Sequence, residues 1–178
     1  MNLSIDNIML ENAEFIGSVS NKSVSVSPEM RVKLTDFSKA EIFKGSDFNC
    51  DKFNYLHQTQ YNMCYFAPNR VSEEMYEARA ADMWTVGMIL FECVVGSSIY
   101  TSKDISVLGL ETMPHNGYWA VMNGKIHSYL ATNSGLNKMN PKILSVITKL
   151  LKVTEEKRMN SMQLLQSRWM SKLYKTSV

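Results

Sequence analysis

Long apolar runs and a strong net charge are both missing from this chain of 178 residues. The longest apolar stretch, residues 83–96, is too short to cross a bilayer and contains Glu92. The first residues lack the basic and then apolar order of a secretory signal. The formal net charge of +2 gives no reason to expect nucleic acid or a membrane surface as a partner. These absences predict a cytoplasmic protein that binds neither of them.

Cysteine and histidine are scarce as well. The three cysteines, Cys50, Cys64 and Cys93, have no spacing typical of a metal site. An odd number of separated thiols favours reduced cysteines in the cytosol. The three histidines are scattered, and none stands beside a recognisable nucleophile. The sequence therefore predicts neither a disulfide framework nor a site built on these residue types.

What is present suits a single domain or one large lobe, because 45% of the residues are hydrophobic and 20% are charged. A short apolar run at residues 7–10 and an alternating run at 31–37 predict two strands, the second with one buried face. We expect a loop or an extra hairpin between them. Residues 38–65 show no helical period and predict a long irregular segment.

The second half of the sequence predicts helices. Residues 81–95 are apolar nearly all round, which is typical of a buried helix. A shorter helix is expected over residues 118–123. Asn140 and Pro141 form an N-cap followed by proline at the first helical position. Asn160 and Gln163 form a capping box, with Met162, Leu164, Leu165 and Trp169 expected to be buried behind it. A small β portion followed by helices is an α+β fold.

Four short segments carry the chemistry, and their order matters more than any one of them. They are Asn7, Asp36-Phe37-Ser38, Ala67-Pro68-Asn69 and Asp82-Met83-Trp84-Thr85-Val86-Gly87. In this order they resemble the C-terminal half of a eukaryotic protein kinase of the Ser/Thr type. The resemblance covers nearly the whole chain and implies an α+β, mostly helical C-terminal lobe with a small β hairpin near the N-terminus.

The resemblance also implies a division of the partial kinase domain that residues 1–178 would form. Residues 1–37 would hold the end of the catalytic loop and the strands. Residues 38–69 would be the activation segment, and residues 70–178 the helical subdomain. A protein substrate or protein partner is implied in the same way.

Individual roles follow from the resemblance. Asn7 and Asp36 would be the Mg²⁺ ligands, with the Asp36 carboxylate holding the ion against the ATP phosphates. The chemistry requires hard oxygen ligands, which amide and carboxylate groups provide. Met9, on the following strand, would form part of the apolar floor under adenine. ATP and Mg²⁺ are therefore the implied cofactors.

Two further residues would hold the lobe together. Asp82 would accept hydrogen bonds from the backbone of the catalytic loop. In the family, the Glu of an Ala-Pro-Glu motif pairs with an Arg between the last two helices, and Arg158 is the counterpart here. Asn69 offers no charge, so a buried Arg158 would carry a desolvation cost unless another acceptor is near. Glu73 and Glu74 are candidate substitutes.

Four departures from the family's pattern involve five residues. Asn2 occupies the position of the catalytic base, and an amide cannot accept a hydroxyl proton, a task worth about 10²–10⁴-fold in rate. Ser4 stands where Ser/Thr kinases have a γ-phosphate-binding Lys. Ser38 replaces a glycine, whose backbone angles serine resists. Tyr61 and Asn62 stand where many Ser/Thr kinases have Gly-Thr.

The sequence also contains no Gly-x-Gly-x-x-Gly loop and no Val-Ala-Ile-Lys strand. We therefore expect one kinase lobe without its N-terminal lobe, inactive as an isolated chain. Two interpretations stay open: part of a Ser/Thr kinase whose upstream coding sequence supplies that lobe, or a pseudokinase-like protein-interaction module. An unrelated α+β domain that matches the motifs by chance is a third.

Overall fold

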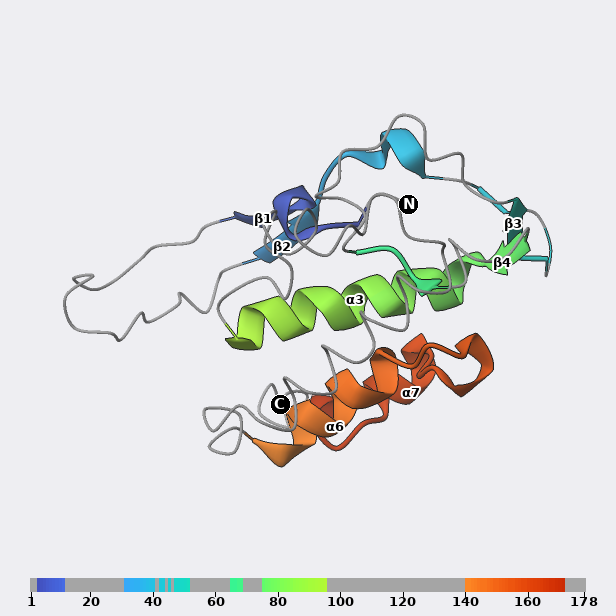
Figure 1. Cartoon of the computed structure of the whole chain (residues 1–178). Helices are drawn as coiled ribbons and strands as arrows, with labels where there is room; N and C mark the ends of the chain where they lie inside the picture. Colours follow the sequence, from blue (N-terminus) through green and yellow to red (C-terminus); the bar gives the residue numbers. More distant parts are fainter. Residues whose placement is uncertain are drawn as a thin grey trace, which may run out of the picture. The chain divides into compact units, whose positions relative to one another are not determined.

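The protein divides into two compact units, residues 1–42 and 43–178. In Figure 1 the first unit carries a small hairpin, and the second carries the long helices. The architecture is mixed α+β and mostly helical, as the sequence predicted. The computed structural model describes residues 3–11, 31–40, 42–43, 45, 47–51, 65–68, 75–95 and 140–171. Within these ranges, no helix is both long and apolar enough to span a membrane.

The first unit is built around an antiparallel hairpin of β1 (Ile8–Glu11) and β2 (Arg31–Leu34). A 3₁₀ turn, η1 (Ile5–Asn7), precedes β1, and another, η3 (Phe37–Lys39), follows β2. The register pairs Ile8 with Leu34 at the end next to these turns. The predicted hairpin near the N-terminus is therefore confirmed.

The side chains of the hairpin are more exposed than the sequence predicted. All four residues of β2 are exposed, and the strand ends at Leu34. Four apolar side chains on the two strands are between 46% and 61% exposed, namely Met9, Leu10, Val32 and Leu34, whereas Ile8 is partly buried. The prediction of one buried face was wrong for β2. A two-stranded hairpin has no apolar layer of its own to cover either face.

The second unit begins its regular structure with a short strand pair that the sequence did not predict. Strand β3 (Asn49–Asp51) pairs antiparallel with β4 (Met75–Glu77). Helix α3 (Ala78–Val95) follows directly. The Glu77 carboxylate accepts hydrogen bonds from the Ala80 amide at 2.7 Å and from Arg79 Nε at 2.6 Å. Glu77 thus satisfies an amide in the first turn of α3 that has no partner within the helix.

Helix α3 is the buried centre of the second unit. Trp84 and Met88 are each 1% exposed, and Phe91 is fully buried. This confirms the prediction of a buried helix over residues 81–95. Figure 1 shows α3 alongside α6 (Pro141–Leu150), and the two helices are in contact.

Local capping signals located the remaining helices correctly. Asn140 Oδ1 accepts a hydrogen bond from the Lys142 amide at 3.0 Å and starts α6, with Pro141 at its first position. Asn160 and Gln163 form both bonds of the predicted capping box, at 2.9 and 3.0 Å. That box starts α7 (Ser161–Leu165), which follows the 3₁₀ turn η6 (Glu155–Lys157).

The predicted burial of the α7 segment is only half right. Leu164 and Trp169 pack against the core cluster that Met83, Val146, Leu150 and Met159 form. Met162 is 61% exposed and Leu165 is 46% exposed, so their predicted burial was wrong. A helix of five residues has one side toward a neighbouring layer, and these two side chains lie outside that side.

The closest approach of α3 and α6 occurs at Gly87. A Cβ atom at this position would lie 2.8 Å from Leu150 Cβ and 2.9 Å from Leu151 Cδ2. Both leucines are fully or almost fully buried. The glycine is therefore needed for the approach of the two helices, because no side chain fits between them.

Arg158 is a buried charge, only 5% exposed. Its guanidinium donates hydrogen bonds to the carbonyls of Lys152 at 2.9 Å, Val153 at 3.1 Å and Ala80 at 2.7 Å. The first two bonds close the turn after α6, and the third joins that turn to the start of α3. The planar guanidinium group of arginine has five N–H donors and can donate to several acceptors at once. Arg158 therefore fastens the end of α6 to α3.

We predict that Gly87→Ala destabilises the protein by about 1–3 kcal/mol, because overpacking outweighs the gain of about 1 kcal/mol in helix propensity. Urea denaturation of the whole chain measures the difference. The control is Cys93→Ala, at an exposed position of the same helix. A Gly87→Ala protein as stable as this control would contradict the close-approach argument.

We predict that Arg158→Lys lowers the free energy of unfolding by about 2–4 kcal/mol, because one ammonium cannot donate to all three carbonyls in these directions. Arg168→Lys, which makes the same change at an exposed residue, should leave stability within about 0.5 kcal/mol of the original. The same denaturation experiment compares them. Equal stability of the two variants would show that the Arg158 guanidinium is dispensable.

Candidate functional site

The hairpin brings the two candidate Mg²⁺ ligands to the same end of the first unit. Beyond the last strand pair, Ile8 with Leu34, the Thr35 amide donates to the Asn7 carbonyl at 2.9 Å. The Thr35 hydroxyl donates to the same oxygen at 3.2 Å. Thr35 therefore lies opposite Asn7, and Asp36 is the next residue. Asn7 and Asp36, which are distant in sequence, therefore lie at the same corner of the hairpin.

The backbone of Asp36 adopts an unusual conformation. Its φ is 55° and its ψ is 70°, in the left-handed region. Among the residues described, it is the one non-glycine residue with positive φ. Aspartate enters this region more readily than most residues, because its short side chain can hydrogen-bond locally. The turn therefore fixes the direction of the carboxylate.

Ser38 holds the Asp36 side chain in this turn. Asp36 Oδ1 accepts hydrogen bonds from the Ser38 amide at 3.3 Å and from the Ser38 hydroxyl at 2.5 Å. Ser38 itself lies inside η3. The positive φ that would fit a glycine is therefore found two residues before Ser38, at Asp36. The serine tolerates its position because the unusual backbone angle does not fall on it.

The other candidate residues of this unit have different surroundings. Met9 is 58% exposed on β1, so a flat apolar group could reach it, and its role under adenine stays a prediction. Ser4 is 4% exposed, and its carbonyl accepts a hydrogen bond from the Asn7 amide at 3.1 Å. A buried serine cannot extend to a phosphate as the family's lysine does. Asn2, at the base position, lies outside the described residues.

The donor set at the corner suits one kind of metal. In the described ranges, no three His, Cys, Asp or Glu side chains gather to hold an ion. The Asn7 amide and the Asp36 carboxylate are the oxygen ligands that the sequence predicted for a cation at the hairpin, and this assignment stays a prediction. Mg²⁺ is typically bound by one or two such groups, with water and phosphate oxygens completing the octahedron.

The end of the predicted activation segment is anchored on α3. Tyr65 and Ala67 are 2% and 1% exposed. The Thr85 hydroxyl donates to the Tyr65 carbonyl at 2.9 Å, and the Tyr65 hydroxyl donates to Glu92 Oε2 at 2.5 Å. Sequence reasoning missed this connection. The signal was available in Glu92, the one carboxylate in the apolar stretch of residues 83–96, because buried charges require partners.

The sequence predicted Asn69, or Glu73 and Glu74 in its place, as partners of Arg158. Asn69, Glu73 and Glu74 fall outside the described residues. The buried guanidinium of Arg158 nonetheless has hydrogen-bond acceptors, as a buried charge requires, because three backbone carbonyls accept its hydrogen bonds. Asp82 lies half-buried in the first turns of α3, and its contact with the catalytic loop stays a prediction.

Cys93 is a free, exposed thiol on α3. Partial burial, and then the negative charge of Glu92, raise the pKa of the Cys93 thiol above its ordinary value. Since the thiolate is the reactive form of cysteine, Cys93 is a poor nucleophile at neutral pH. The chemistry of the described residues therefore centres on oxygen ligands at the hairpin.

Similarity to curated proteins is confined to short segments. Mitogen-activated protein kinase kinase 1 of Arabidopsis thaliana is 29% identical over 73 residues, which cover 41% of this chain and 19% of that protein. Serine/threonine-protein kinase ULK3 of Xenopus laevis is 39% identical over 51 residues, which cover 29% of this chain and 11% of that protein. CBL-interacting serine/threonine-protein kinase 18 of Arabidopsis thaliana is 25% identical over 111 residues, which cover 62% of this chain and 18% of that protein. The matched segments span no more than 19% of the length of these relatives.

A match to a family profile covers far more of the chain. The family described as "Protein kinase domain" matches residues 3–170, which include the hairpin corner, α3 and the capped helices α6 and α7. The motif order, the mixed α+β architecture and this match agree. The chain belongs to the protein kinase domain family.

Proposed function

We propose that this chain forms the C-terminal lobe of a Ser/Thr-type protein kinase domain and that its hairpin corner faces Mg²⁺ and the phosphates of ATP. The observation that carries the proposal is the register of β1 and β2, which places Asn7 opposite Thr35 and next to Asp36. The three-part division at residues 37 and 69 belongs to the same proposal. The family's reaction is phosphoryl transfer from ATP to a protein hydroxyl.

The proposed roles follow from chemistry at the corner. Asn7 and Asp36 would supply the protein oxygens that hold Mg²⁺, and the ion would neutralise charge on the phosphates. Ser38 fixes the direction of the Asp36 carboxylate through two donated hydrogen bonds. Met9 would contact the adenine ring with its exposed side chain.

The same proposal holds that this polypeptide alone does not transfer phosphate. Asn2 at the base position has no proton-accepting carboxylate, and Ser4 is buried where a phosphate-binding lysine would be. The exposed apolar side chains of the hairpin support a second lobe that would cover them. Protein substrates are the proposed partners of the assembled domain.

A pseudokinase-like protein-interaction module is the second candidate, and one contact favours it. Asp36 Oδ1 already accepts two hydrogen bonds from Ser38. An oxygen atom with both acceptor positions in use is a poorer metal ligand. In this case the corner would retain the shape of a kinase site with weakened affinity for Mg²⁺.

We predict that Mg²⁺-ATP stabilises the whole chain against thermal unfolding. At ten times the dissociation constant, the expected gain is about 1.4 kcal/mol, or roughly 3–6 °C in Tm. Asp36→Asn should abolish the shift, because it removes the charge while asparagine tolerates positive φ. The matched control is Asp6→Asn, an exposed residue of η1, which should keep the full shift.

Two results would contradict the nucleotide proposal. One is a wild-type chain whose Tm does not respond to Mg²⁺-ATP at millimolar concentration. The other is an equal shift in the Asp36→Asn and Asp6→Asn proteins, which would place the nucleotide elsewhere. Omission of Mg²⁺ distinguishes metal-dependent binding from binding of the nucleotide base alone.

We predict that Ser38→Ala binds Mg²⁺-ATP about 3–10-fold more tightly than the wild type, because it removes one donor that competes for Asp36 Oδ1. Ser38→Thr retains the hydroxyl and should match the wild type. Titration by thermal shift compares the three proteins. If Ser38→Ala binds equally or more weakly, the serine hydroxyl does not compete with the metal.

A further inference from the structure

The strongest unassigned feature is a groove on the helical unit, which we call the α6–α7 groove. It has a volume of about 920 Å³ and is lined by α6, the residues around η6, and α7 with the turn that follows. This volume lies within the range of pockets that bind small ligands or short peptides. Four basic side chains contribute to its lining: Lys142, Lys149, Lys157 and Arg168.

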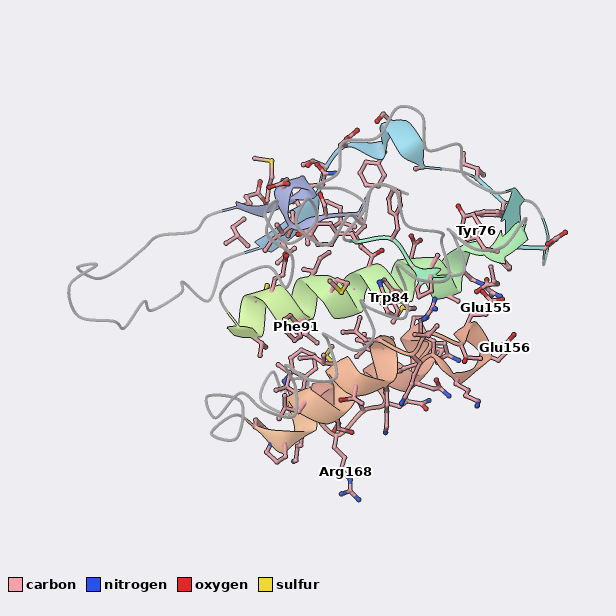
Figure 2. The ribbon with its side chains drawn as sticks, viewed as in Figure 1. Tyr76, Trp84, Phe91, Glu155, Glu156 and Arg168 are labelled. Atoms are coloured by element: carbon pink, nitrogen blue, oxygen red, sulfur yellow. The ribbon has the colours of Figure 1, made fainter. Side chains whose placement is uncertain are left out.

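Among the residues that the structure describes, no acidic side chain lines the groove. The ion pairs found between described residues join Lys33 to Glu11 and Arg79 to Glu77, so they involve none of the groove's four cations. Figure 2 shows Arg168 extending outward from the helical unit, away from the η6 turn that carries Glu155 and Glu156. The groove therefore concentrates positive charge on a chain whose net charge is only +2. An anionic ligand would relieve the repulsion among these cations.

The floor of the groove is apolar and firmly packed. Val146 and Met159 line it and are 3% and 8% exposed. Trp169 also lines it and packs against the same core cluster. Because these side chains already belong to the core, little conformational entropy is lost at the floor when a ligand binds.

The groove also presents amide groups. Gln163 and Gln166 line it on the α7 side. The capping box uses the side-chain oxygen of Gln163 as an acceptor for the Asn160 amide. Its side-chain nitrogen is a donor that this bond does not use. Side-chain amides recognise peptide backbone, which has one donor and one acceptor per residue.

The spacing of the cations suits an extended peptide. Lys142 and Lys149 are seven residues apart on α6, so their backbone positions are about 10.5 Å apart along the helix axis. An extended chain in the polyproline II conformation advances about 3.1 Å per residue and has three residues per turn, so every third side chain points to the same side. Carboxylates three residues apart on such a chain would therefore match the two lysines.

We propose that the α6–α7 groove binds an acidic, extended segment of a protein partner, with carboxylates about three residues apart. A concave site with amide donors and a buried apolar floor fits a peptide better than a flat membrane surface. Nucleic-acid binding relies mainly on contacts between cations and phosphates, which would leave the apolar floor unused. This inference does not depend on nucleotide binding at the hairpin.

The test is calorimetric titration of the whole chain with a peptide that has Glu at its first, fourth and seventh positions and Gly and Ser between them. A peptide with Gln at those positions is the ligand control. We expect the Glu peptide to bind and the Gln peptide to bind at least fivefold more weakly. Binding should also weaken as salt is raised from 50 to 300 mM, because part of the attraction is screened.

The protein variants assign the binding to the groove. Lys142→Gln with Lys149→Gln should weaken binding of the Glu peptide at least fivefold. Lys152→Gln removes one positive charge from the same unit, outside the groove lining, and should change binding less than twofold. The melting temperatures of all variants show whether each one is folded.

Three outcomes would overturn the proposal. The first is no binding of the Glu peptide at low salt. The second is equal loss of affinity in the groove variant and in Lys152→Gln, which would indicate general attraction to a basic protein. The third is tighter, groove-dependent binding of vesicles that contain phosphatidylserine, or of a thymidine oligonucleotide, which would assign the groove to a different class of partner.

Discussion

The close contact between α3 and α6 at Gly87 determines the packing of the helical unit. Without a Cβ at this position, Leu150 and Leu151 reach the backbone of α3 and become buried. The core cluster that includes Met83, Val146 and Met159 then forms beside the contact. The same cluster supports the floor of the α6–α7 groove. The absence of a Cβ at Gly87 therefore affects the packing of both the core and the groove.

Buried polar side chains attach other segments to α3 at both of its ends. Near the start, Arg158 reaches the Ala80 carbonyl, and toward the end, Glu92 accepts the Tyr65 hydroxyl. Buried polar groups destabilise a fold unless they are paired, so each pair permits few alternative arrangements. The scaffold of the family is thus held by contacts that are independent of the substituted residues Asn2 and Ser38. Fold and catalytic competence are separate properties here.

Features with a local cause were predictable from the sequence, whereas those that depend on distant partners were not. The caps at Asn140 and Asn160 require only residues two or three positions away. By contrast, β3 exists because it pairs with β4, some 25 residues later, and three residues carry too weak a pattern to reveal it. The exposure of Met162 likewise depends on which side of α7 meets the core.

The candidate site was partly accessible to sequence reasoning. Motif order identified Asn7 and Asp36, while the strand register that makes them neighbours appears only in three dimensions. Motif order also led us to expect backbone difficulty at Ser38, because a glycine was missing there. The structure places the positive φ at Asp36. A motif thus indicates that a turn is unusual without indicating which of its residues has the unusual angles.

The turn at Asp36 explains how the corner can persist without that glycine. A left-handed conformation costs about 1–2 kcal/mol for an ordinary residue, and less for aspartate. The two hydrogen bonds from Ser38 to Asp36 Oδ1 contribute about 0.5–1.5 kcal/mol each, which offsets this cost. The turn is therefore stable without a bound ion. Because this stability comes from contacts within residues 36–38, it would hold whether or not the proposed base position carries a carboxylate.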